Sequence, residues 1–243
     1  MAKTDTNVRS LENALRILDC FTREKPNLSL VEIADRVDLY PSTASRLIST
    51  MEAMGYMKRN ADSLQYSLGY KLATLGAVCL STEDIRSISH PFLVSLRNRY
   101  NESVGVYVLN KTQRICIDCV PSTQPLHRVI EVGTQMSMTR GASSKVLLAY
   151  LPEKESAAIL ADDPFITTEQ LEEVRQKGYA ISFNEREQSL CSIAAPIFDS
   201  HQKIKAALFI SGPVFRIPEE KGKEIALRLI DTAKEISIEL GYS

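Results

Sequence analysis

The 243-residue chain has no long hydrophobic run and no excess of charge of either sign. No apolar stretch approaches the roughly 18 to 20 residues that span a bilayer, and residues 1–7 lack the apolar segment of a signal peptide. We therefore expect a cytoplasmic protein with no membrane partner. Because 29 Lys and Arg residues stand against 30 Asp and Glu residues, any contact with nucleic acid must come from a local patch.

Cysteine and histidine are too few, and too scattered, to indicate a cofactor or a metal. The odd number of cysteines fits reduced thiols better than a disulfide framework; they are Cys20, Cys79, Cys116, Cys119 and Cys191. Cys116 and Cys119 have CxxC spacing, but a structural zinc would need two more ligands. In a regular strand their odd separation would also direct the two thiols to opposite faces. We predict no metal site and no cofactor.

The residues expected of an enzyme are also missing. We find no acid/base pair, metal set or catalytic triad. Ser143 and Lys145 are close in sequence, but nucleophilic chemistry needs a geometry that closeness in sequence does not supply, so we expect Lys145 to be solvated early in a helix. An enzyme domain attached to a DNA-binding domain is the alternative, and it predicts turnover that depends on Ser143, Ser192 or Lys145.

The length favours two domains, and residues 1–70 predict helix, helix, helix and hairpin. Periodic apolar residues predict a helix over 10–22, with one face formed by Leu11, Ala14, Leu15 and Leu18. Ser29 and Glu32 have the spacing of a capping box. Pro41 favours the start of a third helix that ends near Gly55. Helices this close in sequence must cross sharply, as in a helix-turn-helix, and the hairpin that follows would be its wing.

The third helix has two distinct faces. An apolar face, expected to be buried, carries Ala44, Leu47, Ile48 and Met51. The other face is polar, and residues 39–51 contain no Asp or Glu, so this helix can approach a polyanion without repulsion. A solvated stripe is the alternative for any isolated helix, but the capped helix, tight turn and basic hairpin around it favour the major groove of DNA. The predicted DNA contacts are Ser42, Thr43, Ser45, Arg46 and Thr50, with Lys58 and Arg59 on phosphates.

The rest of the chain alternates short β-rich runs with helices. Residues 70–101 predict an interdomain helix with a kink or restart at Pro91, next to His90 at a helix boundary. Strands are predicted over 104–109, 114–120, 127–132, 179–183, 192–198 and 204–211. Helices are predicted over 144–151, 153–160, 169–177 and 218–240. The pattern favours an antiparallel α+β domain.

Two sets of motifs, in order and at the right separation, resemble the IclR family of bacterial transcriptional regulators. The N-terminal set is SLENALRIL at 10–18, LVEIA at 30–34, STASRLIST at 42–50, GY at 55–56 and YSLG at 66–69. The C-terminal set is GYA at 178–180, Glu185, SIAAPIFD at 192–199 and SGP at 211–213. The resemblance covers nearly the whole chain.

This resemblance implies a winged helix-turn-helix domain at 1–70, a linker helix at 71–90 and a GAF-like effector-binding and oligomerisation domain at 91–243. It further implies a homodimer or dimer of dimers that reads a pseudo-palindromic site in double-stranded DNA. The effector would be a small molecule, such as an organic acid. The implied pocket residues are Ala142 and Ser143 through backbone amides and Ser182, Ser192, Phe209 and Ser211 through side chains.

The chain departs from the family pattern around this pocket. Ser144 and Ser189 stand where Gly is common, Ser192 where Cys is frequent, and some relatives carry an acid at Ser182 and a Ser at Phe209. We expect a pocket that is less anionic, and smaller or more aromatic. Arg128 is a candidate partner for an effector carboxylate, although a solvated position on an exposed strand is the commoner environment for Arg.

The function that these features predict is a ligand-responsive regulator, a repressor or dual regulator of a catabolic operon. A constitutive DNA-binding protein, with a C-terminal domain that only dimerises, is the remaining alternative.

Overall fold

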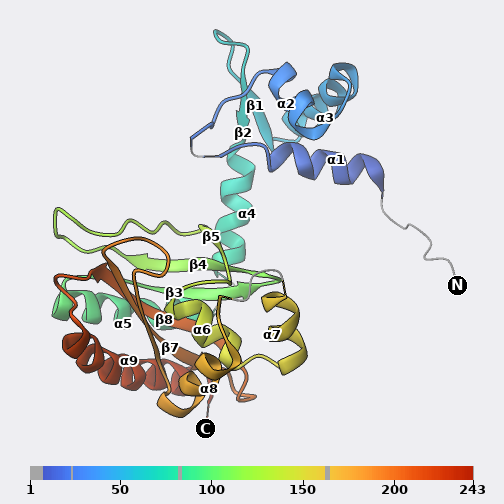
Figure 1. Cartoon of the computed structure of the whole chain (residues 1–243). Helices are drawn as coiled ribbons and strands as arrows, with labels where there is room; N and C mark the ends of the chain where they lie inside the picture. Colours follow the sequence, from blue (N-terminus) through green and yellow to red (C-terminus); the bar gives the residue numbers. More distant parts are fainter. Residues whose placement is uncertain (1–7, 23, 82–83, 162–164, 243) are drawn as a thin grey trace, which may run out of the picture. The chain divides into compact units, whose positions relative to one another are not determined.

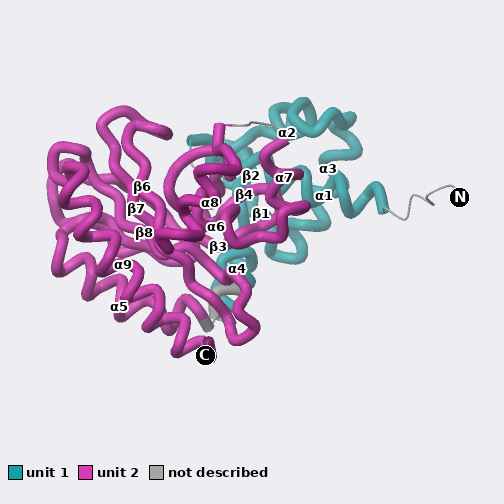
Figure 2. Tube along the Cα trace, turned by 60° about the horizontal axis from the view of Figure 1, so that its bottom comes forward, with its two compact units in different colours: residues 1–80 teal, residues 81–243 magenta. Residues whose placement is uncertain are grey.

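The computed structural model describes residues 8–22, 24–81, 84–161 and 165–242. The chain divides into two compact units, which Figure 2 colours separately: unit 1 comprises residues 1–80 and unit 2 residues 81–243. Among the described residues, no helix is both long and apolar enough to cross a membrane.

Unit 1 is a helical bundle with a small hairpin (Figure 1). Its elements are α1 (Arg9–Leu18), α2 (Leu30–Val37), α3 (Pro41–Ala53), β1 (Met57–Arg59), β2 (Tyr66–Leu68) and α4 (Tyr70–Ser81). The predicted capping box is confirmed, because the Glu32 amide donates to the Ser29 hydroxyl at 3.3 Å while the Ser29 amide donates to the Glu32 carboxylate at 2.8 Å. Asp38 ends α2 in the left-handed conformation and Pro41 opens α3. The predicted helix-turn-helix and wing are therefore present.

The first helix is shorter than predicted, and only part of its predicted face is buried: Ala14 and Leu18 pack against the core, whereas Leu11 and Leu15 do not. It ends at Leu18 rather than near residue 22, and its buried residues are Asn13 and Ile17. Leu11 and Leu15 are 59% and 53% exposed. Ile17 instead joins the core that Ile33, Ala44 and Ile48 form with the hairpin. Leu47, predicted to be buried, is only partly so.

The helical region after the hairpin is divided into α4 and α5 (Asp84–Tyr100). The helix does not restart at Pro91, because Pro91 lies inside α5; a kink there stays a prediction. His90 is likewise not at a helix boundary; its Nδ1 lies 2.7 Å from Oδ2 of Asp118 on the sheet. This contact anchors the middle of α5 on the sheet.

The described part of unit 2 is built on a six-stranded sheet with strand order β5-β4-β3-β8-β7-β6, in which each neighbouring pair is antiparallel. The strands are β3 (Ser103–Asn110), β4 (Gln113–Val120), β5 (Gln135–Ser137), β6 (Ala180–Phe183), β7 (Leu190–Phe198) and β8 (Ile204–Pro213). The remaining helices are α6 (Ala142–Ala149), α7 (Glu153–Leu160), α8 (Thr168–Lys177) and α9 (Glu219–Glu239). The predicted α+β class is confirmed.

The two faces of the sheet bury separate cores, as alternation along a strand requires. In β8, Leu208 and Ile210 join the core shared with α5 and α9, whereas Ala207 and Phe209 join the core shared with α6 and α8. Figure 1 shows α5 and α9 together on one side of the sheet and α6 on the other. The second core is where the candidate cavity lies.

One predicted strand, over 127–132, is absent: residues 121–134 form a loop, and β5 follows it. Side chains rather than a strand ladder hold this loop; the Ser103 hydroxyl donates to the carbonyl of Arg128 at 2.7 Å. The loop thereby directs Arg128 and Ile130 to the cavity.

A bulge in β4 overturns the prediction that Cys116 and Cys119 face opposite ways. Cys116 pairs with Tyr107 and Asp118 with Val106, so Ile117 is an extra residue between them. Both cysteines therefore contact the core beneath α6. Their thiols interact: a hydrogen bond between them raises the pKa of Cys116 and lowers that of Cys119. Among the described residues, no cluster of His, Cys, Asp or Glu could hold a metal ion.

Candidate DNA-binding face and effector cavity

The face of α3 predicted to bind DNA is open to solvent. Ser42, Thr43, Arg46 and Thr50 are exposed and Ser45 is half-buried, whereas Ala44, Ile48 and Met51 are buried on the other side. The Thr50 hydroxyl donates to the carbonyl of Arg46 at 3.1 Å. Arg46 is thus the cation of α3, and it stands among small side chains that leave the backbone accessible.

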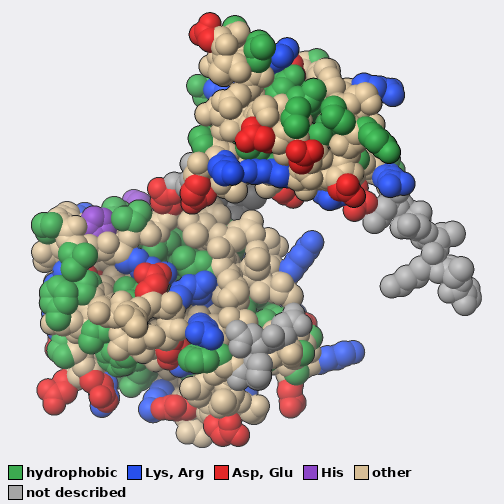
Figure 3. Space-filling model, turned by 45° about the horizontal axis from the view of Figure 1, so that its top comes forward, with side chains coloured by type: hydrophobic (Ala, Val, Ile, Leu, Met, Phe, Trp, Pro, Cys, Tyr) green, Lys and Arg blue, Asp and Glu red, His purple; other side chains and the backbone are tan. Residues whose placement is uncertain are grey.

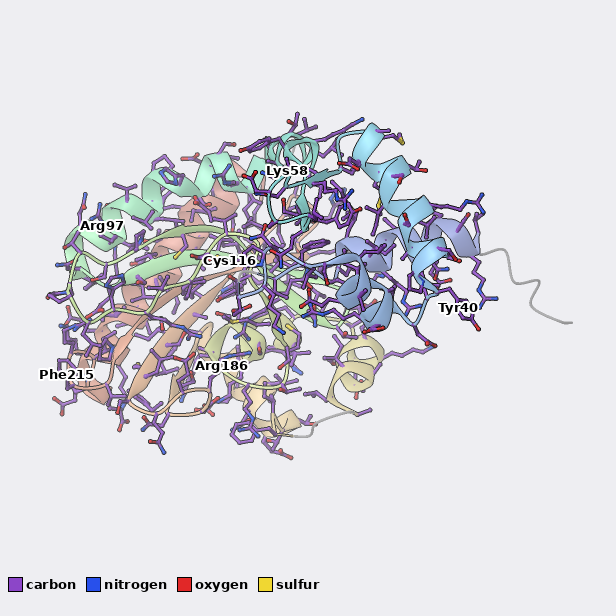
Figure 4. All side chains as sticks on the ribbon, turned by 90° about the horizontal axis from the view of Figure 1, so that it is seen from above. Tyr40, Lys58, Arg97, Cys116, Arg186 and Phe215 are labelled. Atoms are coloured by element: carbon purple, nitrogen blue, oxygen red, sulfur yellow. The ribbon has the colours of Figure 1, made fainter. Side chains whose placement is uncertain are left out.

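The basic residues of the hairpin are exposed but held by local contacts. Lys58, labelled in Figure 4, lies with its Nζ 4.7 Å from the centre of the Tyr70 ring. Arg59 donates from Nε to the carbonyl of Leu64 at 3.3 Å and lies over the Tyr66 ring. These contacts restrict both side chains while leaving their charge at the surface.

Charge on the surface is otherwise mixed. Figure 3 shows basic and acidic side chains interspersed on the displayed face of each unit. Tyr40, at the start of α3, is 84% exposed and was not predicted as a contact residue. A large aromatic just before the helix-opening Pro41 is a signal that could have drawn attention to it.

In unit 2, the seven residues predicted to bind the effector all line one cavity. They are Arg128, Ala142, Ser143, Ser182, Ser192, Phe209 and Ser211. The free space of this cavity, between the sheet and α6, is small, about 10 Å³, which is roughly room for one water molecule. A bound ligand therefore requires the lining side chains to move apart.

Two stacked rings form the floor of the cavity. The rings of Tyr107 and Phe209 lie 4.7 Å apart. Gly105 makes room for them, because a Cβ there would come within 2.7 Å of the Phe209 ring and 2.6 Å of the Asp118 carbonyl. Burial raises the pKa of Tyr107 to about 12, so the floor is aromatic and uncharged at neutral pH.

Lys145 is not the solvated residue that its sequence position suggested. It is 7% exposed, and its Nζ lies 2.6 Å from Oε1 of Glu185. The other oxygen of Glu185 accepts from the Gly141 amide at 3.2 Å. Burial of the whole first turn of α6 requires this cation to be paired.

Arginines dominate the charge of the cavity. Arg128 is not solvated on a strand; its side chain is 11% exposed and reaches Oε1 of Glu187 at 2.9 Å. Arg114 and Arg186 also line the cavity. Burial lowers the pKa of Arg114 to about 10, and Arg186 contributes by repulsion. Three guanidinium groups thus line the same cavity.

Several lining residues were not predicted: Tyr107, Arg114, Ile130, Gly141, Glu185, Arg186 and Leu190. A charged residue at a buried strand position, such as Arg114 in β4, is a signal that the sequence offered. Glu185 belongs to the C-terminal motif set but was not assigned to the pocket, and Arg186 offered no signal, since charge in a turn between strands is ordinary.

The comparisons with known families agree with this geometry. Residues 10–61 match the family described as IclR helix-turn-helix domain, and residues 77–238 match Bacterial transcriptional regulator IclR C-terminal. The chain is 28% identical to Transcriptional repressor IclR of Escherichia coli, over 96% of this chain and 90% of that protein. It is 29% identical to the regulator KdgR of Escherichia coli, over 99% and 95% of the two chains.

Solved structures give the same result. The Thermotoga maritima IclR structure aligns with a TM-score of 0.76 and 31% identity, covering 97% of this chain and 100% of that one. An IclR homologue from Microbacterium hydrocarbonoxydans, solved with 4-hydroxybenzoate, aligns with a TM-score of 0.82 and 21% identity, covering 95% and 98% of the chains, and supports the fold alone. These relatives are DNA-binding regulators rather than enzymes, and this chain belongs to the IclR family of bacterial transcriptional regulators.

Proposed function

We propose that the chain represses, or regulates in both directions, a catabolic operon by binding a pseudo-palindromic site through α3 and the hairpin. The observation that carries this proposal is the exposed polar face of α3, which has no carboxylate over residues 41–51. Ser42, Thr43, Ser45, Arg46 and Thr50 would enter the major groove, with Lys58 and Arg59 on phosphates. The protein would act in the cytoplasm, where the chromosome is.

We propose further that the protein is a homodimer or a dimer of dimers, because two-fold symmetry in a protein matches a palindrome in DNA. Residues 71–90 would act as the linker between a DNA-binding domain at 1–70 and an effector domain at 91–243. An effector would regulate DNA affinity by stabilising one spacing of the two DNA-binding domains. This requires the effector to bind the DNA-competent and incompetent states with different affinities.

The proposed effector site is the cavity of unit 2. Its lining combines arginines, hydroxyls and the start of α6, all of which suit an anionic group. The carboxylate-bearing 4-hydroxybenzoate named for a structural relative is consistent with this class. The presence of the cavity favours a responsive regulator over a constitutive DNA-binding protein.

Selection of source-genome fragments tests the DNA-binding proposal. The purified chain and its Arg46→Ala variant would be incubated with sheared genomic DNA at one salt concentration, and retained fragments would be sequenced. We expect a few fragments that share a palindrome, and their loss with the variant. Fragments without a shared sequence, or equal retention by the variant, would contradict the proposed mode of binding.

A further inference from the structure

The cavity of unit 2 has more positive charge than its neighbouring carboxylates balance. Arg114, Arg128 and Arg186 line it, together with the single carboxylate Glu185. Glu185 is already held by Lys145 at 2.6 Å, and the Arg128 partner Glu187 lies at 2.9 Å. The lining residues and these partners thus comprise four cations and two carboxylates, a surplus of two positive charges.

Arg114 is a buried cation whose contacts are all with neutral groups. The residue is 3% exposed. Its guanidinium contacts are neutral: it donates to the carbonyl of Arg140 at 3.1 Å, to the hydroxyl of Ser144 and to the sulfur of Met136 at 3.7 Å, and it lies over the Tyr107 ring at 4.9 Å. Its Nε is buried and has no hydrogen-bond partner among the residues that the structure describes. A buried cation with only neutral partners is costly, and an anion in the cavity would compensate that cost.

Arg186, labelled in Figure 4, repeats this pattern. Within the described part of the chain its Nη1 is buried with no hydrogen-bond partner, and burial, followed by repulsion from Arg128, lowers the pKa of its guanidinium. Arg128 differs, because its partner Glu187 is 56% exposed. An ion pair to an exposed carboxylate contributes little, so a ligand can replace Glu187 at Arg128.

We infer that the effector of this chain is a small dicarboxylate, with one carboxylate bound between Arg114 and Arg186 and the other by Arg128. The inference rests on the proposed function, since it takes this cavity to be the effector site. With two carboxylates, one can pair with both Arg114 and Arg186 while the other takes the place of the exposed Glu187 at Arg128; with one carboxylate, Arg128 keeps only that weak ion pair. Because the free space is about 10 Å³, a ligand has to displace Glu187 and move lining side chains, and the stacked Tyr107–Phe209 floor favours a short aliphatic chain or a single ring.

Calorimetric titration of the full chain tests this inference. The probes are succinate, glutarate, adipate and phthalate, each compared with its own monoamide, which keeps the shape and removes one charge. Butyrate, benzoate and phosphoglycolate extend the series to monoanions and a phosphate ester. We expect at least one dicarboxylate to bind, and its monoamide to bind at least about tenfold more weakly, since hydrogen bonds between charged groups are the strong ones.

Two variants separate recognition from structure. Arg114→Met and Arg186→Met keep an unbranched apolar stem and remove the guanidinium and its charge; we expect loss of dicarboxylate binding together with an unchanged or raised melting temperature of the free protein. Arg228→Met on α9, whose guanidinium lies 3.5 Å from Glu235, is the matched control and should change neither. If Arg114→Met does not fold, Arg186→Met carries the comparison.

Equal affinity for a dicarboxylate and its monoamide, or binding of monoanions alone, would overturn the inference. Tighter binding of phosphoglycolate than of every dicarboxylate would overturn the assigned class, and so would the absence of binding by the whole series at millimolar concentration. None of these outcomes affects the Arg46→Ala selection. The proposed effector role fails separately, if a bound acid leaves the DNA affinity unchanged.

Discussion

Arg46 concentrates the charge of the proposed recognition face in one side chain. The α3 sequence carries one other ionisable group, Glu52, which follows the carboxylate-free segment 39–51. Exposed serines and threonines surround Arg46 and can adapt to several base edges, whereas a guanidinium can hold one base by two hydrogen bonds. Specificity is therefore expected to depend more on Arg46 than on any hydroxyl around it.

Arg46→Ala should weaken binding to the selected operator by about 1 to 3 kcal/mol and relax the preference at one base pair, if Arg46 makes a bidentate base contact. Fluorescence anisotropy with operator and scrambled duplexes measures this. Arg16→Ala, which removes an exposed Arg from α1, is the control. An equal loss on both duplexes would instead assign Arg46 to a phosphate.

Gly105 has no side chain and so leaves space for the ring of Phe209, its partner on β8. A Cβ at this position would contact both the Phe209 ring and the backbone of Asp118, and strands cannot separate to admit it. Gly105→Ala should therefore destabilise unit 2 by about 1 to 3 kcal/mol, measured by denaturant unfolding. Gly76→Ala on α4 is the control, since no atom lies within 4 Å of its added Cβ; a helical Ala there should stabilise by about 0.5 to 1 kcal/mol.

At the scale of elements, the sequence predicted best what local chemistry determines. Both α2 and α8 begin at capping boxes, and α8 ends at Gly178 with φ of 76°, so their ends are encoded within a few residues. Residues 127–132, in the loop at 121–134, were mistaken for a strand because they are rich in β-branched residues; of these, Ile130 lines the cavity and Val129 is exposed, and none joins a ladder. The bulge at Ile117 depends on pairing with β3, which no local pattern reveals.

Removing one cap should affect one unit. Ser29→Ala should destabilise unit 1 by about 0.5 to 2 kcal/mol, and Thr167→Ala, which removes the equivalent hydroxyl from α8, should destabilise unit 2 by a similar amount. Hydrogen exchange resolved along the sequence distinguishes them. Increased exchange throughout both units with either variant would contradict independent caps.

The cap at α2 also predicts a pH dependence. The Ser29 amide and hydroxyl donate to Glu32 and lower its pKa from 4.5. A lowered pKa in the folded state gives stability that is present above pH 4.5 and lost as the pH falls through the lowered value. The difference in melting temperature between the native chain and Glu32→Ala should therefore shrink in acid. A difference that stays constant down to low pH would contradict a role for the ionised carboxylate.

At the scale of the whole molecule, the proposed dimer makes DNA binding a matter of geometry as well as contacts. Two recognition helices related by a two-fold axis must reach two major grooves on one side of the duplex. Charge helps little here, since the chain is nearly neutral, with a net charge of −1. Half-site spacing should therefore be as important as half-site sequence.

Insertion of about five base pairs, half a helical turn, between the half-sites should weaken binding as much as deleting one half-site does, because it turns the second groove to the opposite side. Insertion of about ten base pairs should restore part of the affinity. Gel-shift titrations with the parent duplex, the two insertion duplexes and the duplex lacking one half-site measure this. Binding that is indifferent to the insertion would show that each half-site is occupied independently.

The bulge at Ile117 has a consequence for how this cavity can change over evolutionary time. Because Ile117 is the additional residue, its deletion would leave Arg114, Cys116 and Cys119 in their present pairings with β3. A deletion between Gln113 and Cys116 would instead shift the pairing register of this part of β4 by one residue. Its side chains would then change from one face of the sheet to the other, and Arg114 would lose its place in the cavity. Descendants of this chain can therefore gain or lose a residue at the bulge without altering the ligand, whereas an indel two residues earlier would change what the cavity recognises.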